Sequence, residues 1–539
     1  MIFYGLLALI VVWATHAIKR RFSQGTFRNI RGPSKQSWWS GNLQQLIDPD
    51  CWAFHDRVTQ DYGGVVKIHG LFGHDHLLIF DPLALYYMLI REQSVYQEYN
   101  IFLQINRLLF GMGIISTRGE HHRKQRKLLN PAFSTSNIRA MFPAFRETIL
   151  QLRRILESHV HDSHPVDIQA FMTRLSLELI GKSGLGYQFN SFDDSSLGDP
   201  YARSIKNLLP TVFSLSIFLL LTPVVCNIGT AEFRRTVINV IPWPALHEIR
   251  DMVDTMQATS VKILAAKTRD IPFADGFGEE QIKGRSDVMS ILLRANNSAS
   301  ESERLPESEI VAQMSSLVFA AMDTTSGALS RLLFVLAEHP EAQCKLRVAI
   351  AEARQANGGE LNFDDLASIP FLDAVCRETM RLYPPVNVVH RTAISDTVLP
   401  LMSPISDVNA KELTQIVVPK GTNLVVSILA ANTNRAIWGE DATLWRPERW
   451  LQPLPQTVTE SRIPGVYSHL MTFLGGPRGC IGFPFAQLAM KATLTLLLET
   501  LSFSLSNEQV VWKLHMVASP TVDGQLRLPL LVSRNIEQV

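Results

Sequence analysis

The chain has 539 residues, of which 46% are hydrophobic and 19% charged, and its formal net charge at pH 7 is +1. This composition excludes an intrinsically disordered chain, and the near-neutral charge balance gives no support to nucleic-acid binding. The length allows two to four domains of roughly 150 residues each, but no linker-like segment divides the middle of the chain, which favours one large domain.

The N-terminus is apolar. Residues 1–18 contain almost no polar side chain, and a run of basic residues follows at once. A run of this length crosses a bilayer core, and the positive flank predicts that its C-terminal side faces the cytosol. A cleaved secretory signal is the alternative, but there the positive charges precede the apolar run. We therefore expect a single-pass anchor at 1–18, a basic linker with Pro and Gly at 19–45, and a catalytic domain at 46–539.

Periodicity predicts a mainly α fold with small β-sheets. Val65–His69 and His76–Phe80 alternate around a glycine-rich turn, which predicts a hairpin. Further strands are expected at 415–418, at 422–428 and in the tail. Apolar residues at three- and four-residue spacing predict helices over 137–160, 165–187, 245–268, 308–339, 341–357 and from about 483 to 502.

Residues 208–226 carry no charge. They could form a second membrane span, but Pro210 and Pro223 near the ends favour a shorter segment that is buried or dips into the membrane surface.

Five widely spaced cysteines without a CxxC pair predict neither a disulfide framework nor a zinc site. Four of them are interpreted as small buried apolar side chains. Cys480 differs, because residues 473–482 place four glycines and a proline around it. Glycines allow close backbone approach to a flat partner. A helix predicted from about 483 directs its first amides at the sulfur, and Gly479 and Ile481 are expected to add N–H donors, all of which favour a thiolate. A glycine-rich bulge around a buried cysteine is the alternative.

The spacing of Phe473, Gly476, Arg478, Cys480 and Gly482 resembles the heme-binding signature of the cytochrome P-450 superfamily, and the similarity extends over nearly the whole chain. The resemblance is to fungal microsomal members. It implies the α-rich P-450 fold behind an N-terminal transmembrane helix, with heme b as cofactor and Cys480 as the sulfur ligand of its iron.

Glu378 and Arg381 lie three residues apart on a predicted helix, and Glu378 shares its apolar face. A buried carboxylate needs a partner; a surface pair worth roughly a few tenths of a kcal/mol is the alternative. The two residues are similar to the family's ExxR motif, whose third member matches Arg449, and this implies a role in core assembly.

Asp323 and Thr324 stand in the middle of the helix expected at 308–339, where such side chains are unfavourable unless they face a partner or a cavity. A local kink with hydroxyls bonded to the backbone is the alternative. The resemblance implies that they deliver protons during oxygen activation. Ala321 stands where the family usually has glycine.

His122 and Arg126 are four residues apart, on one face of a predicted helix. The resemblance implies that both bind a heme propionate, and that Arg391 and Arg478 do so as well; guanidinium groups suit carboxylates. Ordinary solvated bases are the alternative. Basic neighbours of His122 on this helix suggest a docking face for an electron donor, against a plain solvated face.

The resemblance also implies a function. It predicts a monooxygenase that inserts one oxygen atom from O2 into a hydrophobic small molecule, a fungal secondary metabolite such as a terpenoid. Electrons would come from NADPH through a cytochrome P-450 reductase, with cytochrome b5 as a further donor, at the cytosolic side of the endoplasmic reticulum membrane. Fatty-acid or xenobiotic hydroxylation, a reductase-independent isomerase that rearranges peroxides, and a non-catalytic heme-binding scaffold are the alternatives. The expected substrate contacts are apolar: Phe319, Ala320, Val386, Val388, Val389, Pro520 and Thr521.

Overall fold

The computed structural model describes residues 27–160, 164–189, 192, 200–215, 219, 222–269, 286–514 and 516–535. The anchor expected at residues 1–18 lies outside these residues. Within the described part, no helix combines the length and the apolar character that a membrane span requires.

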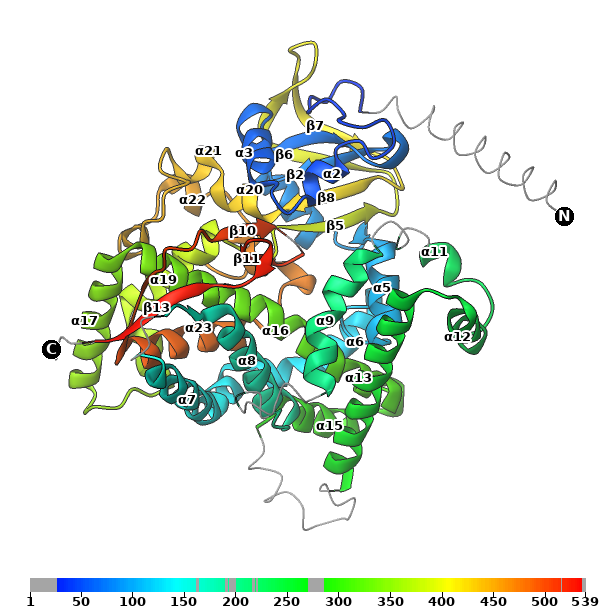
Figure 1. Ribbon diagram of the computed structural model, residues 1–539. Helices are drawn as coiled ribbons and strands as arrows, with labels where there is room; N and C mark the ends of the chain where they lie inside the picture. Colours follow the sequence, from blue (N-terminus) through cyan, green and yellow to red (C-terminus); the bar gives the residue numbers. More distant parts are fainter. Residues whose placement is uncertain are drawn as a thin grey trace.

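The fold is mainly helical with small sheets, as expected, and the largest sheet lies at one side of the helices (Figure 1). Its strand order is β1-β2-β8-β5-β3. Only β2 and β8 are parallel. The predicted hairpin is confirmed, because Val65 pairs with Ile79. The strands of this sheet are β1 Val65–His69, β2 Asp75–Ile79, β3 Tyr96–Glu98, β5 Val388–Ala393 and β8 Asn423–Ser427.

Helix α16, Glu307–Glu338, runs through the centre of the molecule. At 1.5 Å per residue it is roughly 48 Å long. Its sequence is apolar on nearly all sides, and most of its residues are buried against neighbouring elements. These neighbours include α8 (Ile168–Ile180), α13 (Pro244–Arg269) and α23 (Phe483–Leu498).

The other helices agree with the predicted segments to within a few residues, with two exceptions. The helix expected over 165–187 is preceded by a short strand, and the helix expected to reach 502 ends at Leu498 because β9 begins at Leu501. The remaining α-helices are α2 Leu43–Ile47, α3 Trp52–Asp61, α4 Pro82–Tyr86, α5 Asn100–Phe110, α6 Gly119–Leu129, α7 Thr135–Ser158, α9 Pro200–Ser214, α11 Thr222–Val225, α12 Ala231–Val240, α15 Val288–Ser298, α17 Pro340–Ala356, α18 Phe363–Ser368, α19 Pro370–Leu382, α20 Ile428–Thr433, α21 Arg435–Trp438 and α22 Gln456–Thr459.

Three smaller sheets complete the fold, in the strand orders β10-β11-β12, β4-β13-β9 and β6-β7. Most of their strands lie in the tail, where short strands were predicted. Their bounds are β4 Val166–Asp167, β6 Thr397–Ser406, β7 Glu412–Val418, β9 Leu501–Leu505, β10 Val511–Leu514, β11 Ala518–Val522, β12 Gln525–Leu526 and β13 Pro529–Arg534.

The described part of the expected linker packs on the catalytic body. Phe27 and Ile30 are buried, and the Arg31 carbonyl accepts a 3.0 Å hydrogen bond from the Lys67 amide. Within the uncharged stretch 208–226 the structure describes the end of α9, at Ser214, and α11, Thr222–Val225. Residues 216–218, 220 and 221 lie outside the described residues, so that a buried or interfacial segment stays a prediction.

All five cysteines are free, which agrees with the absence of a predicted disulfide framework. Cys51 and Cys376 are buried, as expected. Cys344 is a correction: it is exposed, because it lies on the outward face of α17 rather than in the core.

Candidate functional site

The loop before α23 places Cys480 against a tightly packed backbone. The Cys480 amide donates a 2.8 Å hydrogen bond to the Phe473 carbonyl. Gly476 has a φ of +70°, and a Cβ atom there would lie 2.1 Å from the Leu89 carbonyl oxygen. Only glycine meets both conditions. The aromatic ring of Phe473 lies 4.9 Å from that of Phe483, so the side chains on either side of Cys480 pack on one another.

The environment of the Cys480 sulfur has two opposing effects. Burial has the larger effect and raises the pKa of the thiol above its ordinary value, whereas backbone N–H groups of Gly482 and Phe483 and the charge of Arg126 act to lower that pKa. The side chain nevertheless has exposed surface area, which a group facing an internal hollow would show. The expected contribution of the following helix is confirmed, because both donors lie at its N-terminus. The expectation for Gly479 is wrong, since its amide donates to the Gly476 carbonyl at 2.9 Å.

Helix α6 brings His122 and Arg126 to this loop. Arg126 Nη1 donates a 2.6 Å hydrogen bond to the Gly479 carbonyl, beside Cys480. His122 is buried, and burial together with the charges of Arg478 and Arg126 lowers its pKa to about 3. His122 is therefore neutral near pH 7 and can donate one N–H without adding charge to the site.

Arg391 and Arg478 approach one another around a carboxylate that the sequence did not reveal. Arg478 Nη2 lies 2.8 Å from Glu98 Oε2, and Arg391 Nη2 lies 3.6 Å from Glu98 Oε1. All three side chains are nine-tenths or more buried. The Nε atom of Arg478 is buried and has no hydrogen-bond partner, although backbone carbonyls accept from its other nitrogens.

These groups fit a heme. Arg391 and Arg478 contact the Glu98 carboxylate, Arg126 contacts the neighbouring Gly479 carbonyl, and His122 is neutral. Three guanidinium groups and one carboxylate leave a net charge of +2 among these residues, which would balance the two negative charges of the porphyrin propionates. The unpartnered Nε of Arg478 provides a donor for one of them.

Helix α16 changes character in its middle. Its neighbouring turns are buried, but Phe319, Asp323 and Thr324 are half-buried and Ala320 is exposed, so this stretch faces a hollow. The ring of Phe319 lies 4.6 Å from that of Phe110 on α5. The Thr324 hydroxyl donates a 2.7 Å hydrogen bond to the Ala320 carbonyl. The hydrogen bond to the backbone that the alternative interpretation proposed is therefore present, together with the hollow.

Asp323 has a shifted pKa. Burial raises the pKa of its carboxyl to about 6, while the charge of Lys206 on α9 lowers it. No hydrogen bond to the Asp323 carboxylate is present among the described residues. The sequence did not identify Lys206, because α9 and α16 are far apart along the chain.

The expected substrate contacts other than Phe319 and Ala320 fall into two groups. Val386, Val388 and Val389 are half-buried between α19 and the start of β5. Pro520 and Thr521 lie on β11 and are buried. The Thr521 hydroxyl donates a 2.9 Å hydrogen bond to the Val511 carbonyl on β10, so it already has a partner within the sheet.

Glu378 lies in the core beneath the site. It has no exposed surface, and its carboxylate accepts from Arg381, at 2.8 and 2.9 Å, and from Arg449, at 3.4 Å. The surface-pair alternative is therefore wrong. The network also includes Trp450 and Asp441, neither of which was predicted.

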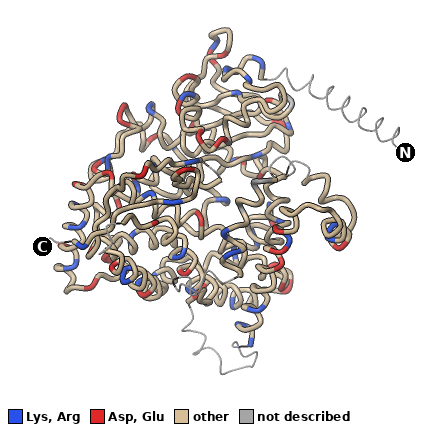
Figure 2. Tube along the Cα trace, in the orientation of Figure 1, with Lys and Arg blue, Asp and Glu red and all other residues tan. Residues whose placement is uncertain are grey.

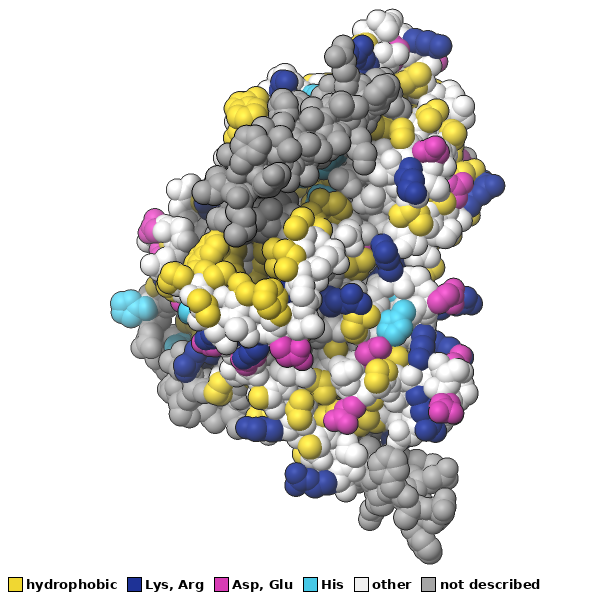
Figure 3. Space-filling view, turned by 90° about the vertical axis from the view of Figure 1, so that its right-hand side faces the viewer, with side chains coloured by type: hydrophobic (Ala, Val, Ile, Leu, Met, Phe, Trp, Pro, Cys, Tyr) yellow, Lys and Arg dark blue, Asp and Glu magenta, His cyan; other side chains and the backbone are white. Residues whose placement is uncertain are grey.

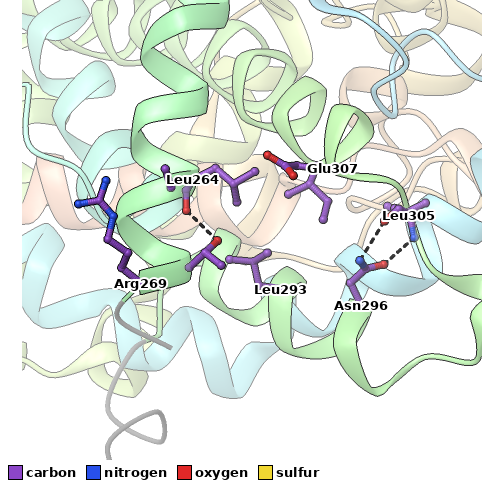
Figure 4. Close-up of a pocket in the computed structure, with 9 residues that line it drawn as sticks. Leu264, Arg269, Leu293, Asn296, Leu305 and Glu307 are labelled. Atoms are coloured by element: carbon purple, nitrogen blue, oxygen red, sulfur yellow. Dashed lines mark hydrogen bonds between the residues drawn. The ribbon is translucent and has the colours of Figure 1, made fainter. Parts of the chain in front are cut away.

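A separate pocket of about 490 Å³ lies between α13, α15 and the start of α16 (Figure 4). It contains none of the predicted site residues. Asn296 at its edge is buried, and its side-chain amide makes hydrogen bonds to both backbone groups of Leu305.

The comparisons with known proteins point to one family. The chain matches the cytochrome P-450 family over residues 31–528. It is 44% identical over 528 residues to cytochrome P-450 monooxygenase 91 of Postia placenta, a match that covers 97% of each chain. Monooxygenase 212 of the same fungus is 42% identical over 532 residues, covering 98% of this chain and 97% of the relative. Ganoderic acid synthetase of Ganoderma lucidum is 39% identical over 494 residues, covering 91% and 90%.

Proposed function

We propose, from the premise that this chain belongs to the cytochrome P-450 monooxygenases, that it inserts one oxygen atom from O2 into a hydrophobic small molecule of terpenoid or similar secondary-metabolite character. The observation that carries the proposal is the Cys480 loop, where the cysteine side chain keeps exposed surface and N–H groups of Gly482 and Phe483, with the charge of Arg126, oppose the rise in its pKa that burial causes. Such a sulfur is suited to bind heme iron.

Each group at the site has a proposed role. Cys480 is the iron ligand, and Arg126, His122, Arg391 and Arg478 hold the propionates. Bound heme supplies the activation of O2, to which electron donation by the thiolate contributes. Phe473, Gly476 and Gly482 shape the loop under the heme, because their side chains or lack of them set how closely the backbone approaches.

In this proposal Asp323 and Thr324 deliver protons during oxygen activation. A carboxyl whose pKa is about 6 takes up and releases a proton readily near neutral pH. The Thr324 oxygen retains acceptor capacity while its hydroxyl donates to the Ala320 carbonyl. These paired groups favour an O2-dependent enzyme over one that rearranges peroxides, which needs no proton delivery to oxygen.

The substrate proposal rests on the lining of the hollow and on one relative. Phe319, Ala320, Val386, Val388 and Val389 all bring apolar surface without full burial. Ganoderic acid synthetase is named for a ganoderic acid product. For this chain we propose only a substrate of similar chemical character. Product analysis would reveal fatty-acid or xenobiotic hydroxylation instead.

An NADPH-dependent flavoprotein reductase is the proposed electron donor, and α6 its docking face. Arg123 is exposed and lies 3.5 Å from Glu120. Lys124 Nζ donates to backbone carbonyls and has no ion pair with a carboxylate among the described residues, although, after the hydrogen bond from Lys127, its charge also lowers the pKa of Glu303. Lys127 is paired with Glu303 at 2.7 Å and contributes less. Figure 2 shows charges of both signs spread over the molecule, so any attraction is local. Lys124→Glu should slow reductase-supported turnover most at low salt; unchanged rates would refute docking here.

Membrane attachment at the endoplasmic reticulum, with the catalytic domain in the cytosol, is likewise a proposal. Its support is the apolar sequence at 1–18 together with an exposed apolar patch on the body. Helices α11 and α5 pack together, and Figure 3 shows hydrophobic side chains gathered on this face. The exposed members are Phe102, Leu108, Val224, Val225, Ile228, Phe233, Val237 and Val240.

The absorption spectrum of the reduced, carbon-monoxide-bound protein tests the heme assignment. Thiolate ligation shifts the Soret band far to the red, and Cys480→Ala should abolish this band. Cys344→Ala, which removes an exposed cysteine, is the matched control and should leave the band unchanged. Product formation from candidate terpenoids should then require NADPH and reductase. Turnover without NADPH would instead indicate the peroxide-rearranging alternative.

A further inference from the structure

Glu98 is a buried carboxylate at the place where heme propionates are expected. It ends strand β3, is 8% exposed, and contacts both Arg478 and Arg391. The register of β3 and β5 pairs Glu98 directly with Arg391. The backbone of the sheet therefore fixes this carboxylate beside the arginines, and a flexible surface position cannot explain it.

The burial of the Glu98 carboxylate at this place is energetically unfavourable unless the carboxylate has a function there. An anion beside Arg391 and Arg478 competes with propionates for the same guanidinium groups. Both guanidinium groups are nine-tenths or more buried, and each lies against Glu98, at 2.8 Å for Arg478 and 3.6 Å for Arg391. Burial lowers the pKa of Arg391, and the charge of Glu98 raises it. Glu98 is thus the carboxylate that stabilises the charge of both.

The contacts also orient the two arginines. Glu98 presents one oxygen to each, Oε2 to Arg478 and Oε1 to Arg391. Arg478 Nη2 also donates to the Thr117 carbonyl and Nη1 to the Ile114 carbonyl, and Arg391 Nη1 donates to the His390 carbonyl. The buried Nε of Arg478 is left without a partner. Glu98 and the backbone therefore hold the two Nη atoms of Arg478 and leave its Nε for another acceptor.

We propose that Glu98 is a positioning residue of the heme-propionate site, which orients Arg391 and Arg478. Its negative charge also lowers the net charge of the three arginines of the site to +2, which balances two propionates. This inference rests on the proposed function, since it assumes that the site holds heme. It assigns a role to Glu98, which is not among the residues that match the motifs of the family.

The test is Glu98→Gln in the full-length holoprotein, which keeps the shape of the side chain and removes its charge. Two quantities are measured: the rate of heme transfer to excess apomyoglobin and the reduction potential of the heme by spectroelectrochemistry. We expect heme transfer to become about tenfold faster, because the ion pairs that hold Arg391 and Arg478 in place are lost. We expect the potential to become more positive, because removal of a nearby negative charge favours the reduced heme.

Three further variants separate charge from structure. Glu120→Gln changes a carboxylate that is 88% exposed on α6 and should alter neither quantity. Glu98→Asp keeps the charge and should keep the potential near that of the wild type, even if the heme is held less tightly. The double variant Glu98→Gln/Arg391→Met removes one charge of each sign and should return the potential toward the wild-type value.

The outcomes distinguish this inference from the proposed function. If the wild-type protein shows no thiolate-ligated heme spectrum, the proposed function itself fails. If that spectrum is present and Glu98→Gln matches the wild type in both heme transfer and potential, only the role of Glu98 is overturned. A faster heme transfer with an unchanged potential would reduce Glu98 to a structural residue and would also overturn the proposal.

Discussion

Replacement of Glu378 by Gln should destabilise the protein strongly. The Glu378 carboxylate has no exposed surface and accepts from Arg381, Arg449, the Trp450 indole N–H and the Arg446 amide. Gln keeps the volume but offers one acceptor oxygen in place of two, and it turns N–H donors toward groups that are themselves donors. The change therefore removes charge and hydrogen bonding while preserving packing.

The magnitude follows from the charges that remain. In the wild type, Arg381 and Arg449 face Glu378, and Asp441 balances part of the charge at 3.0 Å from Arg449 Nη1. Without the Glu378 charge, two buried guanidinium groups share one partly exposed carboxylate. Breaking a buried ion pair by removal of one partner costs about 3–5 kcal/mol. We expect a loss in that range.

The measurement is urea unfolding of the purified protein, followed by tryptophan fluorescence. The control is Asp364→Asn, which breaks the Arg139–Asp364 pair, whose side chains are 52% and 64% exposed. An exposed pair contributes about 0–1 kcal/mol, so the control should unfold almost like the wild type. If Glu378→Gln lost less than about 1 kcal/mol, the assignment of Glu378 to a charge-balanced core would be wrong.

Three further predictions concern the site itself. Because burial raises the folded-state pKa of Asp323 to about 6, its stabilising contribution is complete below its ordinary pKa and is lost as the pH rises through about 6. Asp323→Asn should therefore gain in thermal midpoint relative to the wild type at pH 8 and lose that gain toward pH 4; a pH-independent difference would contradict the shift. Lys206→Met should raise the Asp323 pKa further, and the pH profile of reductase-supported NADPH oxidation should move to higher pH. Gly476→Ala should sharply reduce heme content, because its Cβ would meet the Leu89 carbonyl at 2.1 Å; Gly358→Ala, with a similar φ of +78° and open space around it, should retain heme.

Some features of this protein were determined by its sequence alone. The hairpin of Val65–His69, the long helix through Asp323 and the glycine spacing around Cys480 each depend on residues close together in the chain. Local spacing predicts local geometry, because backbone conformation and helical periodicity act over a few residues. The effect of the helix after Cys480 on the sulfur is predictable for the same reason, since the helix begins only three residues further along the chain.

Other features were decided only by the tertiary structure. Glu98 meets Arg391 because β3 pairs with β5, and Lys206 acts on Asp323 across two helices that are distant in sequence. Even at the Cys480 loop, spacing wrongly predicted a donor at Gly479, because the loop folds that amide onto its own backbone. The sequence determined which side chains carry the chemistry; the long-range pairing of strands and helices decided the charges around them, since electrostatic effects depend on distance in space and not along the chain.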